Sequence, residues 1–274
     1  MKKKYILTNL TKKYFSDDIG RFSAALSYYM IFSFFPILIL VSIFITRFGI
    51  NPVMVENMLN GFMPHEIASL VRNYLEYTYN YGNLKILFIS GFFTLYFPVR
   101  FIENLMAGIN IAYGLKNNRK FFERYSIIFL FVIIVYIMLV ITFASVIIGK
   151  NVFVAVMSFF NVPLSTIYIW QHVRILILFI STFLSVTALY YISPCIRLKL
   201  KDVLIGSAFS SVLLFVVSMI FSYYAENLAN YSILYGSIAV VMMLLYWLFL
   251  TAVILLMGAE LNGIIYSMKY DKNK

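Results

Sequence analysis

Cysteine and histidine are nearly missing from this chain of 274 residues, which has one cysteine, Cys195, and two histidines, His65 and His172. A single cysteine excludes an internal disulfide. No set of cysteine, histidine and acidic residues has the spacing of a metal site, and no glycine-rich nucleotide loop is present. We therefore expect no metal and no other cofactor.

Charged residues are also scarce: they make up 12% of the chain, whereas soluble domains usually have about 25%. Hydrophobic residues account for 62%, and the mean hydropathy is +0.89. A soluble fold of this size could not bury so much apolar surface in one core, so the excess is expected to face lipid. No cleavable signal peptide precedes the first long apolar run, which starts near Ala24. The first helix is expected to be retained.

Six apolar runs are long enough to cross roughly 30 Å of hydrocarbon, which takes about 20 helical residues. They cover roughly residues 24–46, 84–105, 125–148, 175–192, 203–224 and 237–257. The sequence thus predicts an all-α integral membrane bundle of six transmembrane helices that forms one domain over residues 1–274.

The basic residues are divided unequally between alternate connections of these runs. Sixteen of the 22 lysines and arginines fall before the first run, after the second, after the fourth and after the sixth, and five fall on the other connections. Positive charge accumulates on the cytoplasmic side of membrane proteins, so both termini are expected in the cytoplasm. The net charge of +11 then indicates orientation and contact with lipid headgroups rather than nucleic-acid binding.

Two segments outside the apolar runs are expected at the membrane surface. Residues 1–23 mix leucines and aromatic residues with lysines and form a cytoplasmic or interfacial segment. Residues 47–83 form the one long external loop, in which Pro64 could begin an amphipathic helix. A packing role for that helix is favoured over a role as a substrate lid.

Polar residues within the membrane are costly, and function is sought there first. In the second run, Arg100 and Glu103 are three residues apart on one helical face, and Asn104 follows. Pro98 removes a backbone hydrogen bond and is expected to bend the helix. A local ion pair that holds helices together is favoured, and binding of an anionic or zwitterionic solute stays open.

The first run opens with small and polar residues. Ser23 and Ser27 lie four apart on one face, next to Tyr28, which is typical of a close helix interface. Pro36 near the middle is expected to kink the helix, as often occurs around a cavity. Packing explains this pattern about as well as a solute pathway does.

The sixth run ends with another polar group. Gly258 and Ala259 permit close helix approach, and Glu260 follows near the cytoplasmic boundary. We expect Glu260 to pair with a basic group of another segment, either Arg100 or Arg21.

Several of these stretches together resemble the YihY/BrkB family of bacterial membrane proteins. Residues 21–29 and 33–36 are similar to its first-helix signature, and residues 235–239, 246–248 and 258–262 to its last, which adds Gly236 and Asn262 to the candidates. The middle of the chain matches at Asn110, Tyr113, Arg119, 190–194, Asp202, Gly206 and 221–224.

The resemblance implies a multi-pass protein of the bacterial cytoplasmic membrane. Family members have been linked to resistance to host serum and to export of solutes or lipid-type molecules, and the family has also been called ribonuclease BN. A metal-dependent nuclease needs several carboxylates or histidines converging on its ions. The eleven acidic residues here are scattered and both histidines fall on the outer side, so we expect no enzyme.

The favoured function is a transporter or exporter of a small solute or lipid-type molecule in contact with membrane lipids. The alternative is a non-transporting accessory or scaffold protein of the cell envelope, and a ribonuclease or intramembrane enzyme is less favoured. The candidate intramembrane or cleft residues are Arg21, Ser23, Ser27, Tyr28, Pro36, Pro98, Arg100, Glu103, Asn104, Asn110, Gly236, Glu260 and Asn262.

Overall fold

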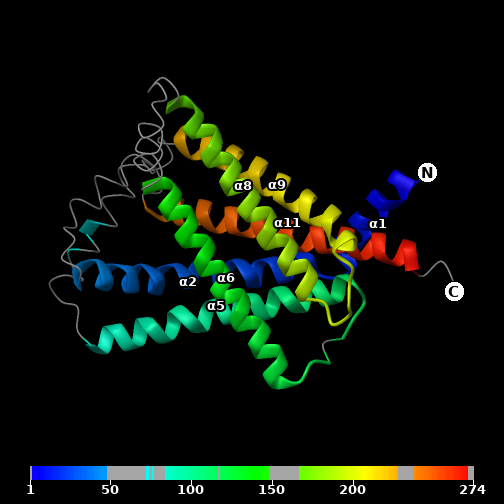
Figure 1. Ribbon diagram of the computed structural model, residues 1–274, viewed down its shortest axis with the longest axis horizontal. Helices are drawn as coiled ribbons and strands as arrows, with labels where there is room; N and C mark the ends of the chain where they lie inside the picture. Colours follow the sequence, from blue (N-terminus) through cyan, green and yellow to red (C-terminus); the bar gives the residue numbers. More distant parts are fainter. Residues whose placement is uncertain are drawn as a thin grey trace, which may run out of the picture. The chain divides into compact units, whose positions relative to one another are not determined.

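The computed structural model describes residues 2–47, 72–73, 76, 84–116, 118–147, 167–227 and 237–270. Over these ranges it is helical, without strands (Figure 1). The main helices are α1 (Lys2–Ser16), α2 (Ile19–Arg47), α5 (Leu84–Ala112), α6 (Phe121–Ile147), α8 (Ile167–Ile192), α9 (Leu200–Asn227) and α11 (Ser237–Tyr270).

The six helices after α1 cover the six apolar runs of the sequence. In the described part of the chain, four of them are long and apolar enough to cross a membrane, over Phe121–Met138, Ile175–Ile192, Leu200–Tyr224 and Val241–Tyr270. Over the residues that the structure describes, the chain is therefore all-helical with several membrane-spanning helices, and the count of six spans stays a prediction. The largest difference from the sequence prediction is α11, which continues as a helix to Tyr270.

Most of the predicted external loop lies outside the described residues, and so does Gly236. Within that loop, Arg72 and Glu76 are helical and form an ion pair of 2.8 Å from Nε to Oε1, one helical turn apart. The proposed amphipathic helix from Pro64 stays a prediction.

The chain divides into two compact units, and both boundaries fall within helices. Unit 1 comprises Met1–Tyr28 and Phe101–Lys274, and unit 2 comprises Tyr29–Arg100. Unit 2 holds the two helical prolines that the sequence singled out, Pro36 in α2 and Pro98 in α5. Both prolines are buried, and each helix continues through its proline.

Aromatic rings and one arginine line the α5 part of unit 2. Phe92 stacks on Tyr96 with ring centroids 5.9 Å apart, and Phe93 stacks on Phe97 at 5.5 Å. The Arg100 guanidinium lies 5.4 Å from the centre of the Tyr96 ring, which is a cation–π contact. This contact gives the positive charge of Arg100 a partner on its own helix.

In unit 1, α9 and α11 pack closely because glycines replace side chains where they cross. A Cβ atom on Gly258 would overlap Ser210 Oγ and come within 2.6 Å of Tyr190 Oη, and one on Gly206 would overlap the Gly258 carbonyl. Asn262 fills the same contact: its Oδ1 accepts a hydrogen bond from Gly206 N at 2.7 Å. Small residues allow membrane helices this kind of approach.

Tyr190 connects three of the membrane-spanning helices. Its ring on α8 is fully buried. Its hydroxyl donates to the Leu255 carbonyl of α11 at 2.6 Å and lies 2.8 Å from Ser210 Oγ of α9. A buried tyrosine needs such partners, because an unpaired hydroxyl inside the bundle would be costly.

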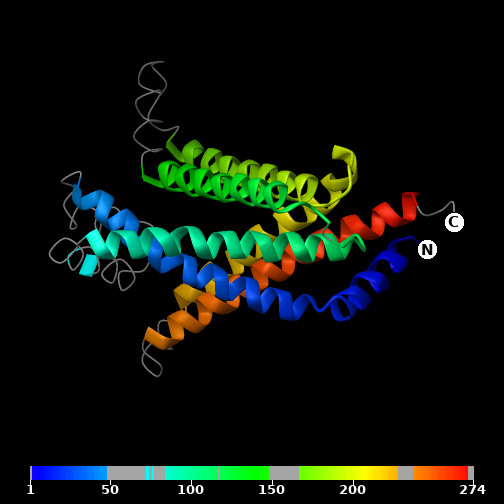
Figure 2. The ribbon, with the colours of Figure 1, turned by 90° about the horizontal axis from the view of Figure 1, so that it is seen from below.

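One end of unit 1 brings together α1 and the ends of several later helices. The start of α1 and the end of α11 lie near each other in both views (Figures 1 and 2). The Tyr113 ring, just after α5, meets the Tyr266 ring of α11 at 5.8 Å, and a Cβ on Gly263 would overlap the Ala112 carbonyl. We call this region the polar end of unit 1, because the networks described below lie there.

The glycine contact between α9 and α11 can be tested by adding one methyl group. Gly258→Ala should lower stability by about 1–3 kcal/mol through overpacking. The measurement is the thermal unfolding midpoint of the purified protein in detergent. Gly91→Ala in α5 is the control, since a Cβ there meets nothing within 4 Å, and it should leave the midpoint unchanged or slightly raised. Equal midpoints for Gly258→Ala and wild type would contradict the packing.

Candidate functional site

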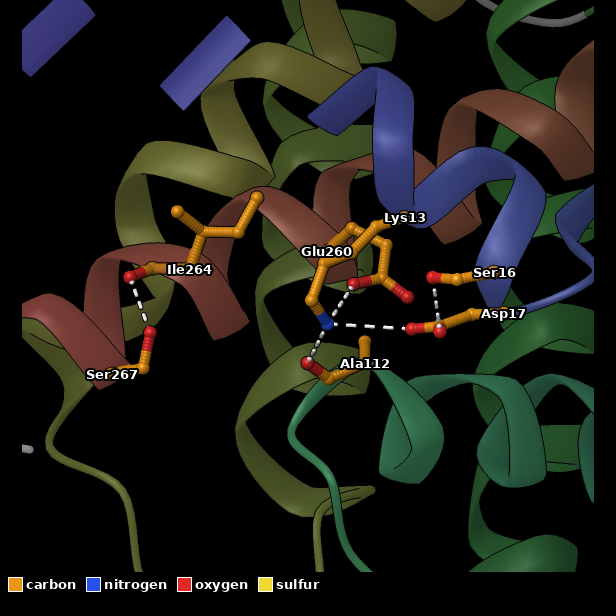
Figure 3. A network of polar contacts seen from close by, with 7 residues as sticks. All are labelled: Lys13, Ser16, Asp17, Ala112, Glu260, Ile264 and Ser267. Atoms are coloured by element: carbon orange, nitrogen blue, oxygen red, sulfur yellow. Dashed lines mark hydrogen bonds and ion pairs between the residues drawn. The ribbon is translucent and has the colours of Figure 1, made fainter. Parts of the chain in front are cut away.

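The candidate site is the network around Lys13, where α1 meets α11 (Figure 3). Lys13 Nζ lies 2.6 Å from Glu260 Oε2 of α11. The same ammonium donates to the Ala112 carbonyl at 2.9 Å and to Asp17 Oδ2 at 3.4 Å. An ammonium group has three N–H donors, so all of them are used. We call Lys13, Asp17, Glu260 and the Ala112 carbonyl the Lys13 network.

Local structure brings Lys13 to this place. Lys13 lies in the last turn of α1, and the buried side chains of Leu10 and Ile19 hold the chain on either side of it. A corner separates α1 from α2, and Asp18 occupies it with a φ of 52°. Aspartate tolerates this left-handed conformation better than most residues do.

The Ala112 carbonyl is available because α5 ends there. The last carbonyls of a helix have no partner within the helix, and they form the negative end of its dipole. Gly114, with a φ of 68°, turns the chain away, and its N–H bonds to the Ile111 carbonyl at 2.8 Å. A lysine from another helix is therefore a favourable partner for the free carbonyl of Ala112.

Burial makes the charge of Glu260 depend on Lys13. The side chain of Glu260 is 3% exposed and that of Lys13 is 30% exposed. A buried carboxylate on a membrane-spanning helix is costly without a nearby cation and hydrogen bonds. Lys13 supplies both from a helix that begins outside the apolar runs.

The sequence expectation that Glu260 pairs with Arg21 or Arg100 was wrong in the identity of the partner. Arg21 Nη2 bonds Asp18 Oδ2 at 2.6 Å in an exposed pair one helical turn apart. The reason is the corner at Asp18: α1 is a separate helix packed on α11, so its lysine reaches Glu260. The expectation that the partner of Glu260 belongs to another segment was right, since Lys13 and Glu260 lie on different helices.

Arg119 and Asn110 join the loop after α5 to the turn after α8. The Arg119 guanidinium donates to the carbonyls of Ile192, Ser193 and Pro194 at 2.9, 2.8 and 2.7 Å. Asn110 Nδ2 also donates to the Ser193 carbonyl, and Asn110 Oδ1 accepts from Cys195 N at 2.9 Å. The planar fork of arginine suits several carbonyls at a helix end. Asn110 is thus a structural residue, 1% exposed.

Asp202 joins the start of α9 to the end of α11. Its Oδ1 accepts from Lys269 Nζ at 2.6 Å, and its Oδ2 accepts from Lys199 N at 3.2 Å. Nearby, burial raises the pKa of the Tyr113 phenol above its usual range, and the Asp202 carboxylate and Tyr266 add to the effect. The Tyr113 hydroxyl has no hydrogen-bond partner among the described residues and stays protonated.

The structure separates most of the other candidates. Glu103 accepts from Arg124 Nη2 of α6 at 2.6 Å. Ser27 bonds the Ala24 carbonyl of its own helix at 2.9 Å, and Ser23 is buried with no hydrogen bond from its hydroxyl in the part of the chain described. Tyr28 is half-exposed and Asn104 is partly buried on α5. None of these five belongs to the Lys13 network.

Sequence reasoning missed three of the four members of the network. Lys13 is one of six basic residues in the N-terminal segment, and its charge alone does not distinguish it from Lys12. Asp17 has no periodic signal, and the Ala112 carbonyl is a backbone atom. Only the position of Asp17 four residues after Lys13, on the same helical face, could have pointed to their contact.

Comparisons with known proteins agree with a membrane protein of one family. A family model described as virulence factor BrkB matches residues 10–274. The ribonuclease-like protein YfkH of Bacillus subtilis is 26% identical over 264 residues, 96% of each chain. UPF0761 membrane proteins of Photobacterium profundum and Vibrio campbellii are 22% and 23% identical, over 94% and 93% of this chain and 79% and 80% of theirs. No solved structure matches the chain significantly.

Removal of the lysine should expose the cost of burying Glu260. Lys13→Met keeps roughly the length of the side chain. It should lower the free energy of unfolding by about 2 kcal/mol, which is within the range for a hydrogen bond to a charged group. The thermal midpoint in detergent measures it. Lys12→Met, an exposed neighbour, is the control and should have little effect.

A double-mutant cycle isolates the pair itself. Because Lys13→Met and Glu260→Gln remove the same interaction, their combined effect should be smaller than the sum of the two single effects. Additive effects would mean that the pair contributes nothing to stability.

Proposed function

The chain belongs to the BrkB virulence factor family of bacterial membrane proteins, and on this premise we propose that it spans the cytoplasmic membrane six times with both termini inside. Each apolar run of the sequence coincides with a helix. The basic connections also meet in space, since Lys13 contacts the end of α5, Arg119 contacts the end of α8 and Lys269 contacts Asp202 at the start of α9. These contacts support the placement of all these basic connections on the same side of the membrane.

The orientation can be tested with single cysteines in a Cys195→Ser background. A membrane-impermeant maleimide should label Asn60→Cys in intact cells, because the 47–83 loop is external in this topology. It should label Lys272→Cys only in inverted membrane vesicles. Labelling of both positions from the same side would contradict the topology.

The function we propose is transport, most simply export, of a small solute or lipid-type molecule. The observation that carries this proposal is the Lys13 network: a buried carboxylate on a membrane-spanning helix is paired with a cation from a helix outside the apolar runs. Ionisable groups buried within membrane helices commonly mark the paths of solutes or ions. A pair between two separate helices can break and re-form as they move, which a transport cycle requires.

Unpaired polar groups in the spans give independent support. The Ser211 hydroxyl on α9 and the indole N–H of Trp247 on α11 are buried and have no hydrogen-bond partner among the described residues. Burial of a polar group without a partner is costly. Such groups are explained if a polar solute or water contacts them during the cycle.

An enzymatic role is disfavoured in this proposal because three acidic groups among the described residues of unit 1 are already engaged. Glu103 is bound by Arg124, Asp202 by Lys269, and Glu260 by Lys13. A metal-dependent nuclease needs free carboxylates that converge on its ions. The Bacillus subtilis relative is called ribonuclease-like, and the engaged acidic groups of this chain do not favour such an activity here.

Reconstituted protein provides the test of transport. Proteoliposomes are assayed first for movement of NBD-labelled phosphatidylglycerol and phosphatidylethanolamine between leaflets, and then for efflux of a panel of amino acids and carboxylates. Wild type should move at least one probe faster than empty liposomes. Glu260→Gln and Lys13→Gln should reduce that rate at least about tenfold, since each loses a charged hydrogen bond.

The controls separate transport from folding. Rates are normalised to monodisperse protein, Lys12→Gln should behave as wild type, and Lys13→Arg, which keeps the charge, should retain part of the rate. No movement of any probe by folded wild type would overturn the proposal and favour the alternative, an accessory or scaffold protein of the envelope.

A further inference from the structure

We propose that the loop between α5 and α6 and the turn between α8 and α9 together form a docking surface for anionic phospholipid headgroups. We call it the basic edge, and it consists of Lys116, Lys120, Phe121, Phe122, Arg197, Lys199, Leu200 and Lys201. It is separate from the Lys13 network and does not depend on transport.

The basic edge is positive because its cations have no acidic partners in the part of the chain that the structure describes. Lys116, Lys120, Arg197, Lys199 and Lys201 are exposed, and among the described residues none of their side chains forms an ion pair. The acids closest to them along the chain are already engaged: Glu123 pairs with Arg119 at 3.6 Å and Asp202 with Lys269 at 2.6 Å. Five cations are therefore free to meet an external anion.

Large exposed apolar side chains lie beside these cations at the starts of two membrane-spanning helices. Phe121 and Phe122 are 67% and 84% exposed, and Leu200 is 54% exposed. The Phe121 ring contacts Tyr125 with centroids 4.5 Å apart, so it belongs to the beginning of α6. Exposed aromatic rings beside lysines at the end of a span are typical of the boundary between headgroups and acyl chains.

The two parts of the basic edge are held together by buried contacts. Arg119 lies between Lys116 and Lys120 in the sequence, and its guanidinium bonds the carbonyls of Ile192, Ser193 and Pro194. Asn110 adds bonds to Ser193 and Cys195. The α5–α6 loop accordingly runs beside the α8–α9 turn (Figure 1). The cations are thus presented on a preformed surface, which reduces the entropy lost on binding.

The chemistry selects an anionic lipid over other anions. The surface combines positive charge with exposed apolar rings at the ends of spans, and a phospholipid presents a phosphate next to acyl chains at that depth. Lysines near an anionic leaflet are attracted to it within a Debye length. A free phosphate would use the lysines and leave Phe121 and Phe122 without contact. Single-stranded RNA could contact both the lysines and the phenylalanine rings, and the test below distinguishes it from lipid.

A tryptophan reporter measures which lipid contacts the edge. The variant Phe122→Trp is made with Trp170→Phe and Trp247→Phe, so that one indole remains, and is reconstituted with brominated phosphatidylglycerol or brominated phosphatidylcholine. Brominated lipid quenches an indole that it touches. We expect the apparent affinity of phosphatidylglycerol for the site beside the indole to be about fivefold higher than that of phosphatidylcholine. This ratio corresponds to roughly one lysine at an anionic surface.

Matched variants assign the preference to the basic edge. Lys120→Gln/Lys199→Gln should reduce the preference toward equal quenching, whereas Lys120→Arg/Lys199→Arg should keep it. Lys4→Gln/Lys12→Gln removes two charges from α1 and should also keep it. The variants are compared only as folded protein whose thermal midpoint equals that of the reporter.

Three results would overturn the proposal. They are equal quenching by the two lipids in the reporter with all its lysines intact, an equal loss of preference in the α1 control, and binding of a labelled single-stranded RNA without any lipid preference. The last result would assign the edge to nucleic acid. None of these readouts requires transport, so their failure is distinguishable from a failure of the proposed function.

Discussion

The ion pair between Lys13 and Glu260 is the interaction on which the polar end of unit 1 depends. Glu260 is buried on a mostly apolar helix, and its charge is tolerable only with a cation in contact. The cation comes from α1, which would otherwise rest on the bundle through few buried side chains such as Leu10. The pair therefore neutralises the Glu260 carboxylate and also holds α1 against α11.

The same end of unit 1 repeats this arrangement with other residues. Arg119 bonds the last carbonyl of α8 and two carbonyls of the turn after it, Lys269 neutralises Asp202 at the start of α9, and Lys13 bonds the last carbonyl of α5. In each case a basic residue supplies donors where a helix end has unpaired acceptors or a buried carboxylate. The surplus of basic residues on these connections therefore has a structural use as well as an effect on orientation. The cations of the basic edge are among those left over.

The helices could be predicted from sequence because their apolar runs are long, and each run coincides with a helix. The extent of α11 was underestimated, since Glu260 and Asn262 look like the end of a span but stay helical when their polar groups are bonded. The partner of Glu260 could not be predicted, because it depends on the corner at Asp18 and on the packing of α1. Hydropathy contains no information about which of two adjacent lysines, Lys12 or Lys13, faces the bundle.

The geometry of the Lys13 network bears on how such a protein could open. Lys13 has a second carboxylate, Asp17, at 3.4 Å just after the end of its own helix, and Lys13 is partly exposed to solvent. If α11 moved away from α1, Lys13 would keep a partner and gain water, whereas Glu260 would lose the cation that it contacts in the described part of the chain. The cost of opening is therefore concentrated on Glu260. In the transport cycle that we propose, a proton or a cationic group of a solute that reached Glu260 would lower that cost and so favour separation of α1 from α11.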